Sequence, residues 1–361
     1  MGRTTWLNLD AEPADLPQAT TFRDKGSLLM NMPVMSSTRA PGTPRRPRLI
    51  ATMAAMLGII PGMAGACSTC GCSLNSDWAS QGYATTSGLH LSLRQDYFNQ
   101  SQLRNGTDSV SPGSFSYPTD KEVQRETINR NTLLGADYNF SRYWGLSLQL
   151  PYMDRYHQTI AEGDTAISTS DTRSIGDLRV VARYQGLSPD AGFGLQFGIK
   201  LPTGSFGQSF VAGPQAGELL DRGLQLGTGT TDALLGVYKF GNLGESLSYF
   251  AQAMAQVALD ARDRFRPGNS VNVNLGLRYM GMARVTPQLQ LNLHSERRES
   301  GALADRENSG ATLGYLSPGV SVKLTRRLDA FAFVQFPVWE RVNGLQLEPR
   351  RLWSLGVQYR L

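Results

Sequence analysis

The sequence is poor in charged residues and in long apolar runs. Only 18% of its 361 residues are charged, and after residue 66 no segment contains the 18 or more consecutive apolar residues that a transmembrane helix requires. This absence excludes a bundle of membrane helices. The length would accommodate two ordinary globular domains, but the low charge and the 38 glycines argue against such domains.

The long apolar run of the chain lies near its start. Leu49–Met63 follows the basic segment Arg45–Arg48 and precedes the small residues Ala64–Ala66. A basic region, a short apolar region and a small-residue cleavage site together predict a secretory signal peptide. We therefore expect residues 1–66 to be a presequence and signal peptide that are removed on export.

Removal of residues 1–66 would leave a nearly neutral protein. That segment contains seven basic and four acidic residues, so the net charge of +5 falls to +2. The basic isoelectric point of the whole chain therefore gives no support for nucleic acid as a partner.

From residue 87 onward the sequence alternates with a period of two. Val271–Tyr279, for example, places Val and Leu on one side and Asn, Gly and Arg on the other. Alternation of this kind predicts strands with two different faces. The apolar face is nearly all Leu, Val, Phe and Ala, and the polar face carries Gln, Asn, Arg and Gly, which indicates a lipid-facing exterior and a hydrated interior.

The alternating segments predict twelve strands. They lie near residues 87–99, 126–140, 144–157, 175–186, 191–203, 228–240, 246–259, 269–281, 286–297, 309–324, 329–340 and 350–361. Strands of ten or more residues suit a tilted bilayer crossing, and aromatic residues at their ends, such as Trp144 and Tyr184, suit an interfacial girdle. We expect a β-bulge at Pro318–Gly319, because the apolar phase of the tenth strand changes there.

The expected fold is all-β: a transmembrane antiparallel β-barrel of about twelve strands over residues 87–361. It is preceded by residues 1–66 and by a cysteine-containing segment at 67–86. A membrane protein without membrane helices must close its sheet, because lipid satisfies no backbone polar group. Alternating short and long connections predict periplasmic turns and extracellular loops. The location expected is the bacterial outer membrane.

Outer-membrane lipid and lipopolysaccharide are the expected surroundings of such a barrel. Arg297–Arg298 and Arg350–Arg351 fall at predicted extracellular strand ends, where a guanidinium group suits a lipopolysaccharide phosphate.

Three segments carry a resemblance to a known group. They are Ser174–Tyr184 with its Gly-Asp pair, Gly198–Gly204 with Leu-Pro-Thr-Gly, and Leu226–Gly236. Together they resemble the proteins associated with the meta-cleavage pathway of phenol degradation. The resemblance covers roughly residues 170–240 and implies an outer-membrane channel for hydrophobic or aromatic compounds. The cysteine cluster ahead of the barrel departs from that family's pattern.

The cysteines of the chain are Cys67, Cys70 and Cys72. Three thiols so close together can bind a soft metal ion, although a structural zinc site would need a fourth ligand. A disulfide in the oxidising periplasm and lipidation of Cys67 are the alternatives. The candidate cofactor is therefore a soft metal ion at this cluster.

Charged residues on the inward face form the second candidate site. By strand phase the lumen-lining set comprises Arg94, Asp137, Asp177, Arg179, Arg183, Lys200, Arg278, His294 and Arg360. Its basic excess would favour anions in a pore. The alternative is that these charges pair across the barrel and fill it with salt bridges.

Catalysis is not expected. His90, His157 and His294 are the histidines of the chain, and only His90 has a serine within reach on the same face of its own strand, Ser92, two positions away. A hydrolase would also need a third group to orient the imidazole. The leading hypothesis is a channel for passive movement of a small solute, aromatic or anionic. The alternative is a barrel that anchors a periplasmic metal-binding or redox-partner platform built on the cysteines.

Overall fold

The computed structural model describes Leu74, Gln81–Gly82 and residues 88–361. The chain divides into two units, Met1–Ile60 and Pro61–Leu361, and every described residue belongs to the second unit. The predicted presequence, the signal peptide and the three cysteines therefore lie outside the described residues.

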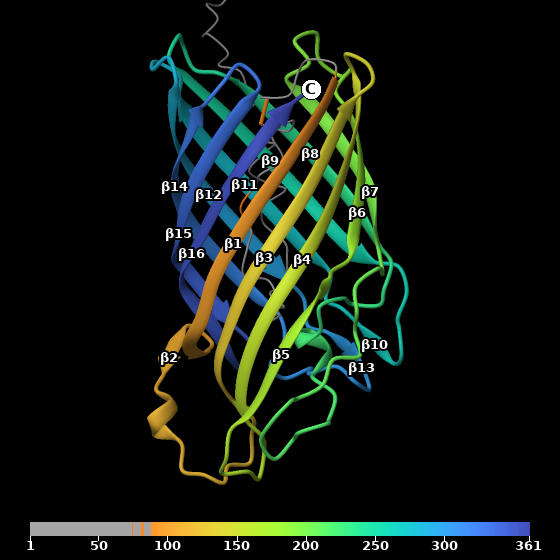
Figure 1. The fold of residues 1–361 in the computed structure, drawn as a ribbon, viewed down its shortest axis with the longest axis vertical. Helices are drawn as coiled ribbons and strands as arrows, with labels where there is room; N and C mark the ends of the chain where they lie inside the picture. The colour runs from red at the N-terminus through yellow and green to blue at the C-terminus, as the bar shows by residue number, and fades with distance from the viewer. Residues whose placement is uncertain (1–73, 75–80, 83–87) are drawn as a thin grey trace, which may run out of the picture. The chain divides into compact units, whose positions relative to one another are not determined.

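The described chain forms a closed antiparallel barrel, seen from the side in Figure 1. Around the wall the strand order is β16, β15, β14, β12, β11, β9, β8, β7, β6, β4, β3 and β1. Closure follows from the pairing of β1 with β16, which runs from His90 opposite Arg360 to Asn105 opposite Leu345. The predicted twelve-strand antiparallel barrel is confirmed.

The wall strands differ in length around the barrel. They are β1 (Gly88–Asn105), β3 (Val123–Asn139), β4 (Trp144–Ile160), β6 (Leu178–Tyr184), β7 (Phe193–Leu201), β8 (Asp232–Asn242), β9 (Leu247–Ala258), β11 (Ser270–Tyr279), β12 (Val285–Glu296), β14 (Ala311–Lys323), β15 (Leu328–Val342) and β16 (Leu345–Arg360). Short additional strands are β2 (Asp108–Val110), β5 (Ser168–Ile175), β10 (Phe265–Arg266) and β13 (Ser300–Gly301).

Two short 3-10 helices complete the described elements, η1 (Pro112–Ser114) and η2 (Arg222–Leu224). No helix in the part of the chain that the structure describes is long and apolar enough to cross a membrane.

The alternation of the sequence separates the two faces of the wall. Exposed apolar side chains cover the outside, among them Leu134, Leu235, Leu277, Leu289 and Leu355. Buried polar side chains line the inside, among them Gln196, Gln252, Asn274, Gln290 and Asn292. On the outer face Trp144 contacts Tyr184, with ring centroids 4.8 Å apart. The exterior is thus suited to lipid and the interior to water.

Part of the interior is apolar, which the sequence pattern did not predict. Leu313 and Tyr315 on β14 are buried with Phe98, Val342 and Leu352. This inward cluster explains why the apolar phase of β14 changes along its length. The predicted bulge at Pro318–Gly319 was wrong, because the register shift lies between Gly314 and Tyr315.

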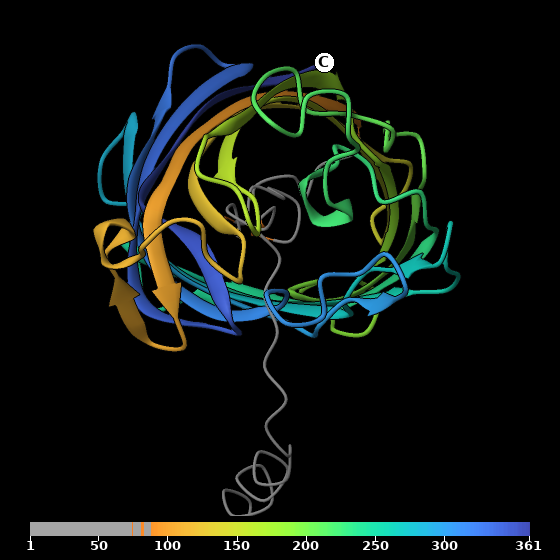
Figure 2. The same ribbon diagram turned by 90° about the horizontal axis from the view of Figure 1, so that it is seen from below.

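The connections at one end of the barrel also differ from expectation. Only Asn343 and Gly344 join β15 to β16, whereas the predicted strands leave a longer loop over residues 341–349. Gly344 makes this turn possible, since its φ of 55° suits glycine. At the same end the 202–231 loop bends inward, and η2 lies within the barrel outline when viewed along the axis (Figure 2).

Candidate functional site

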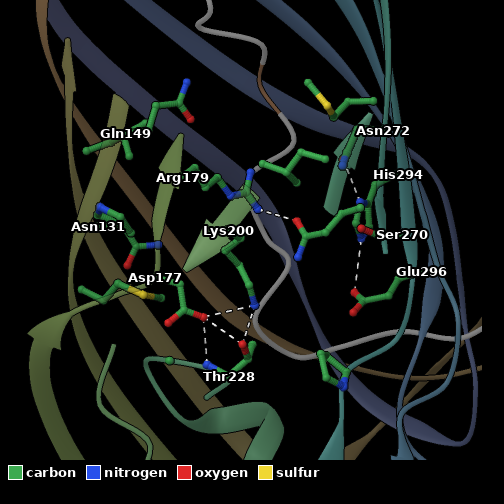
Figure 3. Close-up of a pocket in the computed structure, with 18 of the residues that line it drawn as sticks. Asn131, Gln149, Asp177, Arg179, Lys200, Thr228, Ser270, Asn272, His294 and Glu296 are labelled. Atoms are coloured by element: carbon green, nitrogen blue, oxygen red, sulfur yellow. Dashed lines mark hydrogen bonds and ion pairs between the residues drawn. The ribbon is translucent and has the colours of Figure 1, made fainter. Parts of the chain in front are cut away.

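The interior holds a cavity of about 400 Å³. Side chains from β1, β3, β4, β6, β7, β8, β9, β10, β11 and β12 line it, together with residues of the 202–231 loop. A volume of this size matches a small-molecule site. Figure 3 shows Asn131 and Gln149 on one side of the cavity, with Asn272 and His294 across from them.

A buried ion cluster lies beside the cavity, where β4 changes partner. The C-terminal half of β4, Tyr152–Thr159, pairs with β5, and the N-terminal half, Trp144–Gln149, pairs with β6. Gly176 and Asp177 separate β5 from β6. Lys200 Nζ lies 3.2 Å from Asp177 Oδ2 and 2.9 Å from Asp232 Oδ2. All three side chains are at most 8% exposed. Opposite charges this close compensate one another for their burial.

The same cluster fixes the 202–231 loop to the wall. Asp177 accepts hydrogen bonds from the backbone nitrogens of Gly204 and Thr228, each at 3.0 Å, and from the Thr228 hydroxyl at 2.8 Å. Thr230 donates to Asp232 at 2.9 Å. The aspartate of the Gly-Asp pair therefore ties both ends of the loop to β6 and β7 (Figure 3).

Close backbone contact explains the glycines of these segments. A Cβ on Gly227 would lie 2.4 Å from the carbonyl carbon of Gly204, and one on Gly204 would lie 2.7 Å from the Cα of Gly227. Neither position leaves room for a side chain. The Pro-Thr-Gly and Gly-Thr-Gly motifs thus form one junction, although 23 positions separate Gly204 from Gly227 in the sequence.

The middle of the loop is anchored by a buried arginine and an apolar cluster. Arg155 is 1% exposed; its Nη1 donates to the Leu224 carbonyl at 2.7 Å and its Nε to Asn129 at 2.8 Å. Phe210, Leu220 and Leu224 pack together beside it. The loop is therefore part of the packed interior rather than a surface connection.

Most of the predicted lumen charges have a partner of opposite charge. Arg94 pairs with Asp96 at 2.9 Å, Arg183 with Asp137 at 2.6 Å, and Arg360 with Asp329 at 2.9 Å. His294 Nε2 lies 3.4 Å from Glu296. This pairing favours the salt-bridge alternative over a strongly basic pore field.

Two predicted residues have other contacts in the lumen. Arg179 donates to Gln256 at 2.8 Å, and Arg278 donates to Ser248 at 3.0 Å and to the Gln81 carbonyl at 2.6 Å. Leu74, which precedes β1 in the sequence, also lies inside the barrel, where it packs against Phe331 and Phe333.

The structure brings five of the predicted lumen residues together at the cavity and places four elsewhere. Those at the cavity are Arg94, Asp177, Arg179, Lys200 and His294. The others, Asp137, Arg183, Arg278 and Arg360, belong to the inward face but do not line the cavity.

The histidines do not form a catalytic arrangement with serine. Both ring nitrogens of His294 are engaged, Nδ1 with Asn272 at 2.8 Å and Nε2 with Glu296. His157 is fully buried and contacts Thr127 at 2.8 Å. His90 is also buried, and the Ser92 beside it is paired with Gly135 across the sheet. In the part of the chain that the structure describes, no serine and orienting group accompany any of these imidazoles together.

Sequence reasoning missed several residues that shape the cavity. Asp232 and Thr228 looked like the start of a strand and a loop turn, and Arg155 was not singled out. Strand phase would have placed Asp232 inside, because Leu235 and Val237 point outward. Cys67, Cys70 and Cys72 are outside the described residues, and among those described no group of histidine, cysteine and acidic residues could bind a metal ion.

Comparison with known proteins gives a likeness of fold alone. No family model and no curated protein matches the chain. An outer membrane channel from Pseudomonas putida F1 is similar in structure, with a TM-score of 0.57 and 15% identity over 77% of this chain and 97% of that chain. The CymD monoaromatic hydrocarbon channel gives a TM-score of 0.40 at 9% identity, covering 83% and 98% of the two chains. The NanC porin gives 0.41 at 10% identity, covering 75% and 100%.

Proposed function

We propose that the protein is a bacterial outer-membrane channel that passes a small solute, aromatic or anionic. The observation that carries the proposal is the polar-lined cavity of about 400 Å³ inside a closed barrel with an apolar exterior. A closed barrel is one of the two structures that can span a membrane, an apolar exterior suits lipid, and a hydrated interior is the means by which such barrels pass solutes.

The aromatic and anionic alternatives draw on different observations. The resemblance of residues 170–240 to meta-cleavage-pathway proteins supports an aromatic solute. Arg179 lines the cavity and is exposed within it, which supports an anionic one. Paired charges elsewhere in the lumen weaken the field that would attract anions.

Lipopolysaccharide is the proposed neighbour of the end that carries the long loops. Arg297, Arg298, Arg350 and Arg351 are all exposed there. Their guanidinium groups suit phosphate by charge and by geometry.

Planar-bilayer recording on the refolded barrel tests the channel. We expect discrete conductance steps, and a reversal potential near zero in a KCl gradient because the lumen charges are largely paired. Arg179→Gln should shift the reversal potential toward cations. A correctly refolded barrel that passes neither ions nor small solutes would exclude the proposal.

A further inference from the structure

A chain of hydrogen-bonded side chains runs across five strands of the inner wall. Gln252 Nε2 donates to Gln196 Oε1 at 2.7 Å, and Asn274 Nδ2 donates to Gln252 Oε1 at 3.3 Å. Asn292 Nδ2 donates to Asn274 Oδ1 at 2.8 Å, and Ser317 Oγ donates to Asn292 Oδ1 at 2.6 Å. We call these five residues the amide ladder; they lie on β7, β9, β11, β12 and β14.

The amide ladder has one direction and is tightly held. Every member after Gln196 donates to the preceding member, and the bond from Gln252 to Gln196 passes over β8, which lies between β9 and β7. Reversing any inner amide would break two hydrogen bonds. Exposure is 3% for Gln196, 7% for Gln252, 4% for Asn274, and 0% for Asn292 and Ser317. Hydrogen bonds linked in series and removed from water reinforce one another. The ladder is therefore a rigid polar surface.

Part of this polar surface borders the cavity. Gln196, Gln252 and Asn274 line it, as do the neighbouring Gln256 and Asn272. A primary amide has two N–H donors and a carbonyl with two lone pairs. The ladder uses one N–H each of Gln252 and Asn274, so a second N–H on each is left to meet a ligand.

The opposite wall of the cavity has a different chemistry. Leu133 on β3 pairs across the strands with Pro151 on β4, and Met153 follows on the same face. In the circle of wall strands β3 lies opposite β11, six positions away in either direction. The cavity thus sets a hydrogen-bonding wall against an apolar patch that Asn131 and Gln149 flank.

Charge at the cavity limits what these two walls can bind. Lys200, Asp177 and Arg94 line it, but each already has an oppositely charged partner within 3.2 Å. Arg179 also lines the cavity and donates to Gln256 at 2.8 Å, so an ion moved between the amide wall and the apolar patch would lose water while the charged groups of the cavity keep their present partners. An uncharged molecule with one hydrogen-bonding edge would lose far less.

We propose that the amide ladder determines the specificity of the lumen, and that it selects uncharged solutes carrying an amide, carbonyl or hydroxyl edge on a flat apolar body. The inference rests on the proposed channel function for its biological meaning. The ladder binds the polar edge through Gln252 and Asn274, while the patch of Leu133, Pro151 and Met153 contacts the apolar body.

Isothermal titration calorimetry on the refolded full barrel in detergent tests this inference. Benzamide, benzoate and benzylammonium have nearly the same shape and differ in charge. We expect benzamide to bind at least about tenfold more tightly than either ion. Gln252→Leu should weaken benzamide binding about tenfold, because one or two net hydrogen bonds of ordinary strength are lost, and should leave toluene binding unchanged.

The control is Gln288→Leu, a buried amide on β12 that does not line the cavity. It should leave benzamide binding unaltered. Gln252→Glu, which keeps the shape and adds a negative charge, should reverse the preference toward benzylammonium even if Gln252→Leu refolds poorly. Equal binding of benzoate and benzamide, or unchanged benzamide binding in Gln252→Leu, would overturn the inference.

Calorimetry does not depend on passage through the membrane, so the two proposals fail separately. A barrel that binds benzamide as expected but never conducts removes the channel and leaves the ladder site. A barrel that conducts and shows no preference for benzamide removes the ladder's role in specificity and leaves the channel.

Discussion

Replacing Lys200 with methionine should destabilise the barrel strongly. The change keeps the apolar stem and removes the one ammonium group placed between Asp177 and Asp232. The side chain of Asp232 is 1% exposed and that of Asp177 is 8% exposed, so two carboxylates would share a nearly dry site. Removing one partner of a buried ion pair typically costs about 3–5 kcal/mol. Guanidinium-induced unfolding of the barrel in lipid vesicles should show a loss of this size.

A second substitution tests whether electrostatics is the cause. Adding Asp232→Asn to Lys200→Met removes one of the two carboxylates, while Asp177 keeps its hydrogen bonds from Gly204 and Thr228. The double variant should therefore recover about 1–3 kcal/mol relative to simple additivity. Lys239→Met, on the exposed face of the neighbouring strand β8, is the control and should change stability by less than about 0.5 kcal/mol. A Lys200→Met barrel as stable as that control would refute the reasoning.

Three further predictions concern the loop, its titration and the outer face. Gly227→Ala should destabilise the barrel by about 1–3 kcal/mol, since its Cβ would meet the Gly204 backbone, and limited proteolysis should show cleavage within residues 202–231. Burial and the adjacent Asp221 carboxyl raise the pKa of Glu122 to about 8 from an ordinary 4.5. The contact between Glu122 and Asp221 should therefore be fully present below pH 4.5 and lost as pH rises through 8. Hydrogen-exchange protection of the 202–231 loop, corrected for the intrinsic pH dependence of amide exchange, should therefore fall as pH rises through 8 in the unaltered chain and in Glu162→Gln, but not in Glu122→Gln. Leu134→Arg, on the lipid face of β3, should reduce folding into vesicles by about 2–4 kcal/mol if it lies at bilayer depth, whereas full folding yield would place β3 outside the membrane.

The alternation of the sequence was enough to predict the barrel and its strand number. A period of two directly encodes which side chains meet lipid, so Leu134 and Leu235 identify their faces without any tertiary information. The break between β5 and β6 was not predictable in this way. At this break the side chain of Asp177 accepts hydrogen bonds from Gly204 and Thr228, and no local pattern signals a contact across 51 positions.

The pairing of charged side chains could not be predicted from the sequence for a related reason. Strand phase placed Arg183 and Asp137 on the inside but could not give the register that brings them to 2.6 Å. Register depends on every turn along the way, and β1 and β16 were each predicted with one end several residues from its observed position. The interior therefore seemed more basic from composition than it is in the folded chain.

The two polar systems of the lumen should respond differently to mutation, because they perform different structural tasks. The ion cluster of Asp177, Lys200 and Asp232 connects the wall to the inward loop, so changes there should alter stability and conductance together. The amide ladder joins strands that are already held by backbone hydrogen bonds, as between Gln252 and Asn274. Its loss should cost the barrel about 1–3 kcal/mol, less than the loss of the ion cluster, and should change which solutes bind. If Lys200→Met and Gln252→Leu instead shift stability and solute preference in parallel, the lumen behaves as one network and the separation is wrong.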